Sequence, residues 1–521
     1  MILFRLLAAL AICASTRAAE TPNILFISVE DWTTNAIGCY GNPTVKTPNI
    51  DKLAASGIRF ERAYAQSTVC NPSRASFVTG LYPDSSRIFS NDESMDELVP
   101  HDAPSLAATL ASKPGAWLAQ TGKLVHKWED AGRFAKGFHR IEYAHRYDIP
   151  PGFEGELVKL PHGPIDTGDD VEKEAFFVPN KSASAKLRAL HAEREAALAA
   201  GKPDNWATRK PFQQYFAEQI GDSGLDAASM EDGRIARSTA KLLGEIAEKK
   251  QPFFLSVGFY STHTPLLAPK EFVEMYDPAK IELSLTDPAN DKGIPEIAKR
   301  NGQNYDIFNG MYPEFKATPE RQRAAIAAYY ACASYVDAQI GILLDALEKN
   351  GLAQNTIVIV FSDHGFHLGE HGLWSKFTLF EESTRVPLII RAPGRAGNGQ
   401  SSNAIVELVD LFPTLCDLWQ IEKPAKLEGR SFISLLDNPS LPFKQAARSV
   451  VTLGGLGRSI RTGTHRYTEY HASRNPPGPD SKPLALELYD LISDPREQRN
   501  LAIEPEHASL TKSLRKQLPF R

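Results

Sequence analysis

Two short apolar segments limit what this chain can fold into. Residues 23–29 form one β-branched apolar run, and residues 356–362 form another. Continuous apolar runs of this length are typical of buried parallel strands. Each run is followed at once by two polar side chains able to bind a metal, namely Glu30 and Asp31 after the first and Asp363 and His364 after the second. Because α/β sheets bind ligands outside the carboxyl ends of their strands, these four side chains are predicted to face one site.

Helical patterns separate and follow the predicted strands. Four segments have helical character, at residues 50–57, 105–111, 233–249 and 321–349. Strands that alternate with helices predict an α/β fold, in which a large, doubly wound and mostly parallel sheet is flanked by helices.

Three stretches are predicted to be insertions. Residues 148–164 and 283–313 are polar and rich in Pro and Gly, and are expected to run as long surface excursions over the edge of the sheet. Residues 182–200 are rich in Ala, Glu, Lys and Arg, which favours a solvated helix without a chemical role.

The pattern changes after about residue 436. Short β-like runs follow at residues 448–453 and 467–471, and a polar tail ends the chain. Such runs predict a smaller C-terminal α+β domain packed on the first. We therefore expect a large domain at residues 20–440, which holds both predicted strands, and a small domain at residues 441–521.

The first 19 residues differ from the rest of the chain. Arg5 precedes an apolar run at residues 6–14, and small residues follow at Ala18 and Ala19. This arrangement is typical of a cleavable signal peptide, so residues 1–19 are expected to direct export. The destination would be the periplasm or medium of a bacterium, or the lysosome or extracellular space of a eukaryote. The apolar run is too short to span a bilayer, and no membrane span is expected elsewhere.

Charge and cysteine content narrow the function. A net charge of -5 with 23% charged residues shows no polybasic field that would bind nucleic acid. Beyond the signal peptide the cysteines are too few and scattered for a disulfide scaffold in an exported protein. Three of them, Cys39, Cys332 and Cys416, are predicted to be buried thiols that act as small hydrophobes. The fourth, Cys70, lies in a motif.

The most specific motif in the chain runs from Cys70 through Asn-Pro-Ser to Arg74, with Thr79-Gly80 downstream. It resembles the Cys-x-Pro-Ser-Arg signature of the formylglycine-dependent type I sulfatases, which belong to the alkaline phosphatase superfamily. The resemblance implies that a maturation enzyme converts Cys70 to formylglycine. A hydrated aldehyde offers one oxygen to attack sulfur and a second whose deprotonation expels sulfate. Arg74 is expected to aim its guanidinium at this group and at the anionic ester.

The resemblance also covers both predicted metal strands and implies one divalent cation. Its ligands would be Glu30, Asp31, Asp363, His364 and an oxygen of the modified Cys70. An oxygen-rich set favours a hard cation, and Ca²⁺ is the family expectation, with Mg²⁺ as the alternative. Position 30 departs from the commoner aspartate, so Glu30 is either a ligand or a carboxylate behind the ligands.

Residues 121–126 resemble the Gly-Lys-x-x-His element of the same family. This likeness implies that Lys123 binds sulfate oxygens and that His126 takes a proton during release of sulfate. A near-neutral imidazole suits such a transfer.

Residues 260–265 resemble the family segment that delivers a sulfate-binding histidine. His263 and Lys376 are therefore expected to neutralise charge on the sulfate and to assist the departing alcohol. Lys123, His263 and Lys376 would form the substrate-binding set. Three residues close to Lys376 in sequence are expected to pack rather than to bind a ligand, namely His367, His371 and Trp374.

Several stretches look most like the iduronate-2-sulfatase branch, among them residues 82–87, 406–409 and 412–414. That branch implies a sulfated, uronic-acid-containing polysaccharide or oligosaccharide as substrate. A basic and aromatic cluster is either a grip for an anionic sugar or a surface patch; it comprises Trp128, Arg133, His139, Arg140, His145 and Arg146.

Two other functions compete with this prediction. A phosphonate or phosphate ester hydrolase of the same superfamily would use the same groups, because both esters are tetrahedral and anionic. An inactive protein that binds sulfated glycans would keep the fold but lose the modified cysteine or the sulfate-contacting groups. The joint presence of Lys123, His126, His263 and Lys376 favours an enzyme.

Overall fold

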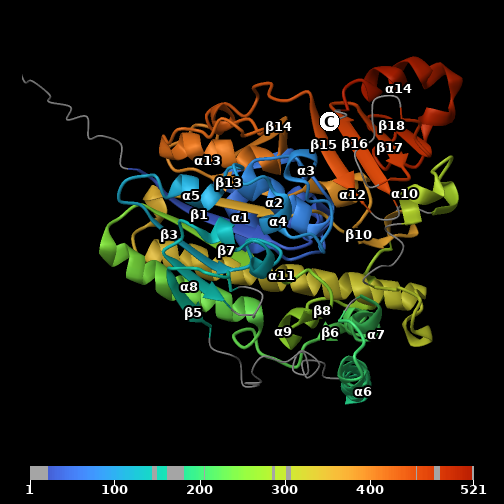
Figure 1. The fold of residues 1–521 in the computed structure, drawn as a ribbon, viewed down its shortest axis with the longest axis horizontal. Coiled ribbons are helices and arrows are strands. Elements are labelled where there is room, and N and C mark those ends of the chain that lie inside the picture. Colours follow the sequence, from blue (N-terminus) through green and yellow to red (C-terminus); the bar gives the residue numbers. More distant parts are fainter. Residues whose placement is uncertain are drawn as a thin grey trace, which may run out of the picture.

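The structure is a computed structural model, shown in Figure 1. It describes residues 21–143, 149–160, 181–204, 206–283, 288–300, 307–452, 455–473 and 481–518. The predicted signal peptide and two members of the basic and aromatic cluster, His145 and Arg146, lie outside these residues. No helix in the described part of the chain combines the length and apolar character needed to cross a bilayer.

The predicted strand at residues 23–29 is the centre of the fold. It forms β1 (Asn23–Val29), in which every residue is buried. β7 (Phe253–Phe259) pairs with β1 on one side and β9 (Thr356–Ser362) on the other, both in parallel. β3 (Trp117–Gly122) continues the parallel arrangement beyond β7. The predicted α/β fold with a mostly parallel sheet is confirmed.

Further strands extend this sheet to ten within the described residues. They are β4 (Arg140–Tyr143), β5 (Glu156–Lys159), β2 (Ile58–Tyr64), β12 (Arg385–Val386), β13 (Leu388–Arg391) and β14 (Gln400–Glu407). β13 runs antiparallel between β2 and β9, so the sheet is mixed. One prediction is wrong in part. Within residues 148–164, which were expected to form a surface excursion, residues 156–159 form β5 and pair with β4 at the edge of the sheet.

Both faces of the sheet are covered because side chains alternate along each strand. Ile24 and Phe26 of β1 pack in the core beneath α2 (Cys70–Thr79) and α13 (Leu411–Trp419). Leu25 and Ile27 point to the opposite core, beneath two long helices, α8 (Glu231–Lys249) and α11 (Pro319–Lys349). In Figure 1 these two helices run along the lower side of the sheet.

The predicted helices are present. α1 (Pro48–Ala55), α5 (Leu106–Leu110), α8 and α11 match the four predicted segments, and α6 (Lys181–Ala199) matches the insertion helix. Apart from short 3-10 helices, the other described helices and strands of the large domain are α3 (Pro83–Ser86), α4 (Met95–Leu98), α7 (Trp206–Ala217), β6 (Ile220–Asp222), β8 (Leu266–Ala268), α9 (Lys270–Val273), α10 (Glu296–Arg300), β10 (His367–Leu368), β11 (Trp374–Ser375) and α12 (Glu381–Thr384).

A second, antiparallel sheet follows near the C-terminus, as predicted. Its order is β15 (Ala446–Val451), β16 (Leu456–Thr462), β17 (His465–His471) and β18 (Ala485–Asp490). α14 (Ala508–Arg515) packs against it, and Figure 1 shows this small domain beside the large sheet. The boundary near residue 440 stays a prediction.

A buried ion network joins the two sheets. Arg466 of β17 lies 2.6 Å from the Glu497 carboxylate through Nε, and its Nη2 binds the carboxylate of Glu381 in α12. Nη2 also donates to Thr384 Oγ1 at 3.0 Å. Burial raises the pKa of Glu381, but Arg466 and two further arginines outweigh burial and lower this pKa to about 2. Glu381 therefore remains charged against Arg466 at neutral pH.

Replacing Arg466 by Ala should destabilise the protein by about 3–5 kcal/mol, because it removes the cation paired with the buried Glu497 carboxylate and leaves Glu381 with only the more distant Arg461, at 3.6 Å. Urea unfolding at neutral pH would show this as a lower midpoint. Arg499→Ala is the matched control, since Arg499 is 60% exposed in its pair with Glu504 and should change stability by less than about 1 kcal/mol. Equal midpoints for the two variants would contradict the proposed importance of the buried network.

Candidate active site

The two polar pairs predicted from the sequence meet at one edge of the sheet. Val29 of β1 lies opposite Ser362 of β9, so the residues that follow each strand are neighbours. The backbone N–H of Asp31 donates to Asp363 Oδ1 at 3.1 Å. Both carboxylates are fully buried.

Cys70 is the first residue of α2 and lies at this edge of the sheet, where it is 1% exposed. Its Sγ lies 3.3 Å from His364 Nε2 and 3.4 Å from Lys376 Nζ. Ser73 Oγ, one turn along α2, donates to the Asp363 carbonyl at 2.5 Å and so ties the helix to β9. Burial raises the pKa of the Cys70 thiol well above its usual value, so the unmodified side chain is a poor nucleophile at neutral pH.

The donor atoms fit a divalent cation. One ligand atom from each of Asp31, Cys70, Asp363 and His364 lies within 4.8 Å of the others. A second group with the same spacing contains Glu30, Asp31, Cys70 and His263. Carboxylate oxygens with one imidazole suit a hard or borderline cation. Glu30 thus shares the site with Asp31, but it belongs to the group that contains His263 rather than to the group with Asp363.

The backbone of Asp31 is held in an uncommon conformation. Its φ is 58°, in the left-handed region that non-glycine residues seldom occupy. Tyr329 of α11 donates to the Asp31 carbonyl at 2.5 Å and accepts from Thr33 N–H at 3.0 Å. These two bonds fix the turn that aims the Asp31 carboxylate. The sequence contained no signal for Tyr329, because it lies in a long helix remote from the motif.

Lys123 follows β3 and binds the Glu30 carboxylate through Nζ, which also lies 5.6 Å from the centre of the Tyr260 ring. Burial raises the pKa of Glu30, but Lys123, with His263, Arg74 and Lys376, holds this pKa well below its usual value. Glu30 is therefore ionised. Thr262 Oγ1 donates to the Glu30 carbonyl at 2.5 Å and links the His263 segment to β1.

Arg74 is fully buried and uses most of its donors within the protein. Nε donates to Asp363 Oδ2 at 3.0 Å, and Nη1 donates to the carbonyls of Lys123 and Leu124 at 3.1 Å. Nη2 is buried and has no hydrogen-bond partner within the described residues. Arg74 thus positions Asp363 and the Lys123 loop, and the two N–H groups of Nη2 have no partner among the described residues.

His126 is half-buried, and its Nδ1 has no hydrogen-bond partner in the described part of the chain. Burial and the nearby charge of Lys123 lower the pKa of His126 well below its usual value. The imidazole is therefore neutral and able to accept a proton.

The two remaining predicted residues approach Cys70 from other loops. Lys376 Nζ donates to both carboxylate oxygens of Asp31 at 2.8 Å. His263 directs Nδ1 toward the Thr264 carbonyl at 2.7 Å, which leaves Nε2 as its second polar atom. The fold thus gathers the predicted site residues at one sheet edge, although their catalytic roles stay predictions.

The three residues expected to pack do so. His367 Nε2 lies 2.8 Å from Thr378 Oγ1, and His371 Nδ1 lies 3.0 Å from Asp291 Oδ1. Trp374 is 2% exposed and packs edge-on against Phe308.

The described members of the basic and aromatic cluster have structural partners. Trp128 is buried in the core, and His139 Nδ1 accepts from the Leu118 backbone N–H. Arg133 donates to the Met95 and Val99 carbonyls, and Arg140 pairs with Glu142 at 2.7 Å. These contacts argue against a grip for an anionic sugar, and the buried Trp128 does not fit the other alternative, a surface patch.

Solved structures of known proteins share this fold. The phosphonate monoester hydrolase of Agrobacterium radiobacter superposes with a TM-score of 0.69 at 22% identity, covering 95% of this chain and 94% of that one. A structure in complex with its substrate D-glucosamine-2-N,6-O-disulfate superposes with a TM-score of 0.68 at 22% identity, covering 96% and 97%. At these identities the likeness establishes the fold.

The sequence comparison establishes the family. The chain is 28% identical to iduronate 2-sulfatase of Mus musculus, an alignment that covers 96% of this chain and 94% of the relative. The sulfatase family matches residues 22–421, which include the whole site described above. The chain therefore belongs to the sulfatase family and is a sulfuric ester hydrolase.

Proposed function

We propose that this sulfatase removes sulfate from a carbohydrate that contains uronic acid, and that Cys70 works as formylglycine. The observation that carries the proposal is the position of Cys70, whose Sγ lies among the ligand atoms of Asp31, Asp363 and His364. Relatives named for iduronate 2-sulfate, and a similar structure that binds a sulfated glucosamine, support a sulfated sugar as substrate. Membership of the sulfatase family supports both the conversion of Cys70 to formylglycine and the binding of a divalent metal ion at this site.

Four protein side chains would hold the cation, namely Asp31, Asp363, His364 and Glu30. We propose Ca²⁺, because carboxylate oxygens dominate this set, with Mg²⁺ as the alternative. A cation bound there supplies positive charge that acidifies a hydroxyl of the modified residue and stabilises the sulfate oxygens.

The remaining groups act on the substrate. A hydrated aldehyde at position 70 supplies the two hydroxyls that the reaction needs, one to attack sulfur and one to expel sulfate. Lys123, Lys376 and the unpaired Nη2 of Arg74 would donate to sulfate oxygens, where negative charge develops in the transition state. His263 would protonate the departing alcohol, and the neutral imidazole of His126 would take the proton whose removal releases sulfate.

A phosphonate or phosphate ester hydrolase is the second candidate, and the shared fold of the Agrobacterium radiobacter enzyme favours it. The same cationic groups would stabilise either tetrahedral anion. An inactive glycan-binding protein is disfavoured, since Lys123, His263 and Lys376 are all present at the edge that holds Cys70.

Export and maturation complete the proposal. Residues 1–19 would be removed as the chain leaves the cytoplasm, and a formylglycine-generating enzyme would modify Cys70. Both changes would appear in the mass of the purified protein and of its position-70 peptide.

Replacing Cys70 by Ala should lower the hydrolysis of an aryl sulfate by more than about 10⁴-fold, because no other group supplies the nucleophile. The thermal midpoint should stay close to that of the parent protein. Cys39→Ala is the matched control, since Cys39 is a half-buried free thiol outside the described site and should keep full activity. Turnover by the Cys70→Ala protein would refute the proposed role of this residue.

Replacing His126 by Ala should separate the two halves of the reaction. The alcohol should be released in one burst stoichiometric with enzyme, while sulfate release falls by about 10²–10⁴-fold, the usual contribution of a general base. Rapid mixing with parallel assays of alcohol and sulfate would measure both. The neighbouring Lys127→Ala serves as control, and a His126 variant that releases no initial burst of alcohol would exclude this role.

Substrate choice is tested with a panel of defined sulfated oligosaccharides and released sulfate as the readout. We expect the highest kcat/KM on an oligosaccharide sulfated on its uronic acid, and a lower value on one sulfated only on its hexosamine. Aryl phosphate and phosphonate esters belong in the same assay. Preference for either of them over aryl sulfate would replace the proposed activity with the second candidate.

A further inference from the structure

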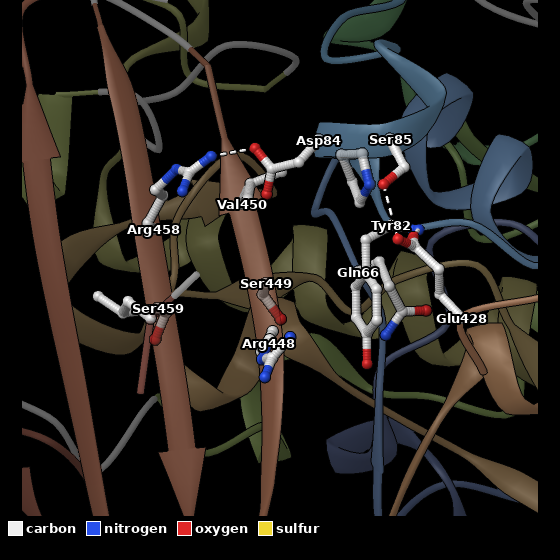
Figure 2. A pocket seen from close by; sticks show the side chains of 12 residues that line it. Gln66, Tyr82, Asp84, Ser85, Glu428, Arg448, Ser449, Val450, Arg458 and Ser459 are labelled. Atoms are coloured by element: carbon white, nitrogen blue, oxygen red, sulfur yellow. Dashed lines mark hydrogen bonds and ion pairs between the residues drawn. The ribbon is translucent and has the colours of Figure 1, made fainter. Parts of the chain in front are cut away.

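A crevice of about 370 Å³ lies between the two domains, and none of its lining residues belongs to the site described above. Figure 2 shows it between α3 with its preceding loop on one side and β15 and β16 of the small domain on the other. Its lining residues are Gln66, Tyr82, Pro83, Asp84, Ser85, Glu428, Arg448, Ser449, Val450, Arg458, Ser459 and Leu518.

The crevice is built by the docking of the small domain. The backbone N–H of Val450 donates to the Gln66 carbonyl at 2.9 Å, and Ser449 Oγ donates to the Ala65 carbonyl at 2.6 Å. These bonds hold β15 against the segment that leads into α2. Arg458 of β16 forms an ion pair with Asp84 of α3 across the opening, as Figure 2 shows. Ligand pockets often occur at such domain interfaces.

One cation in the crevice is not neutralised by a protein carboxylate. Arg448 lies with its guanidinium 5.5 Å from the centre of the Tyr82 ring, and among the described residues no carboxylate pairs with it. Glu428 supplies a carboxylate on the facing wall, where it accepts from Ser85 Oγ and from the Tyr82 backbone N–H, each at 2.7 Å. With the Arg458–Asp84 pair, the lining carries two cations and two anions.

This lining matches the chemistry of an uncharged sugar. Each sugar hydroxyl both donates and accepts, so guanidinium donors and carboxylate acceptors are equally useful. Pro83, Val450 and Leu518 offer apolar surface to the C–H faces of a ring. A sulfated unit has no such match, because the two carboxylates offset the two guanidinium groups and the lining has no net positive charge to select an anion. The volume falls within the range of about 300–1,000 Å³ that is usual for small-molecule sites.

We propose that this crevice is a second carbohydrate site, which binds an uncharged sugar unit of the substrate chain or of a separate glycan. The inference rests on the proposed function only in that the substrate is a carbohydrate. A second binding site raises the affinity for long carbohydrate chains without changing the chemistry at Cys70. Once one site is occupied, binding of the same chain at the other site is intramolecular and therefore favoured.

The test uses the full-length Cys70→Ala protein, in which substrate turnover cannot interfere. Uncharged di- and tetrasaccharides of glucose, galactose and N-acetylglucosamine are titrated by calorimetry, and hydrogen exchange locates the contact. We expect saturable one-site binding of at least one sugar, with protection at residues 82–86 and 448–451. Adding Arg448→Ala should weaken this binding about tenfold, the usual effect of losing a hydrogen bond to a charged group.

Two further variants sharpen the test. Arg448→Lys keeps the charge but loses the forked donor, and should retain part of the affinity. Arg499→Ala removes an exposed arginine of the same domain and should leave binding unchanged. In the enzyme with Cys70 intact, Arg448→Ala should hydrolyse a small aryl sulfate at the parent rate.

Three results would overturn the inference: no saturable binding of any uncharged sugar, equal affinity of the Arg448→Ala protein, or tighter, salt-sensitive binding of the sulfated sugars at the crevice. The failure of the proposed function is distinguishable from these, because it would appear as lack of sulfate release by the enzyme with Cys70 intact. The binding measurement does not depend on that release.

Discussion

Buried carboxylates at the ends of β1 and β9 impose the arrangement of everything around them. Asp31 and Asp363 are fully buried, and an unpaired buried carboxylate costs several kcal/mol. Each therefore needs positive partners, and the strand ends themselves contribute only the imidazole of His364, 3.4 Å from Asp31 and 3.7 Å from Asp363. Lys376 binds Asp31, and Arg74 binds Asp363, from segments that lie far away in the chain. Charge compensation thus draws a loop and a helix onto one sheet edge.

The same contacts place Cys70. Arg74 and Cys70 both belong to α2, so the bond between Arg74 and Asp363 sets the position of the helix whose first residue is Cys70. Ser73 adds a second tie to the Asp363 carbonyl. Because Nη1 of Arg74 also donates to the carbonyls of Lys123 and Leu124, it ties the Lys123 loop to the helix. Precise placement of this kind is what a preorganised catalytic site requires.

The sequence predicted the parts of this arrangement that depend on local pattern. β1 and β9 were predictable to the residue, because a strand buried on both faces reads as an unbroken apolar run. The site side chains were predictable because they lie in contiguous motifs. Tyr329 was not, since its bond to Asp31 depends on how α11 packs on the sheet. β5 was missed for a similar reason: its four residues are partly exposed and become a strand only by pairing with β4.

The residues that select the carbohydrate are expected to lie outside the sheet edge that holds Asp31, Asp363 and Cys70. Under the proposed function, the groups around Cys70 would bind a tetrahedral anion. A phosphonate monoester hydrolase and a protein that binds a disulfated glucosamine share this fold, so the fold by itself does not specify the ester. Arg133 and Arg140, which looked like sugar contacts, are already bound to backbone carbonyls and to Glu142. A side chain held in this way would have to break those bonds before it could bind a sugar. If the substrate is a carbohydrate, as proposed, donors without a carboxylate partner are better placed to bind it, and among the described residues the Arg448 guanidinium at the domain interface is one of them.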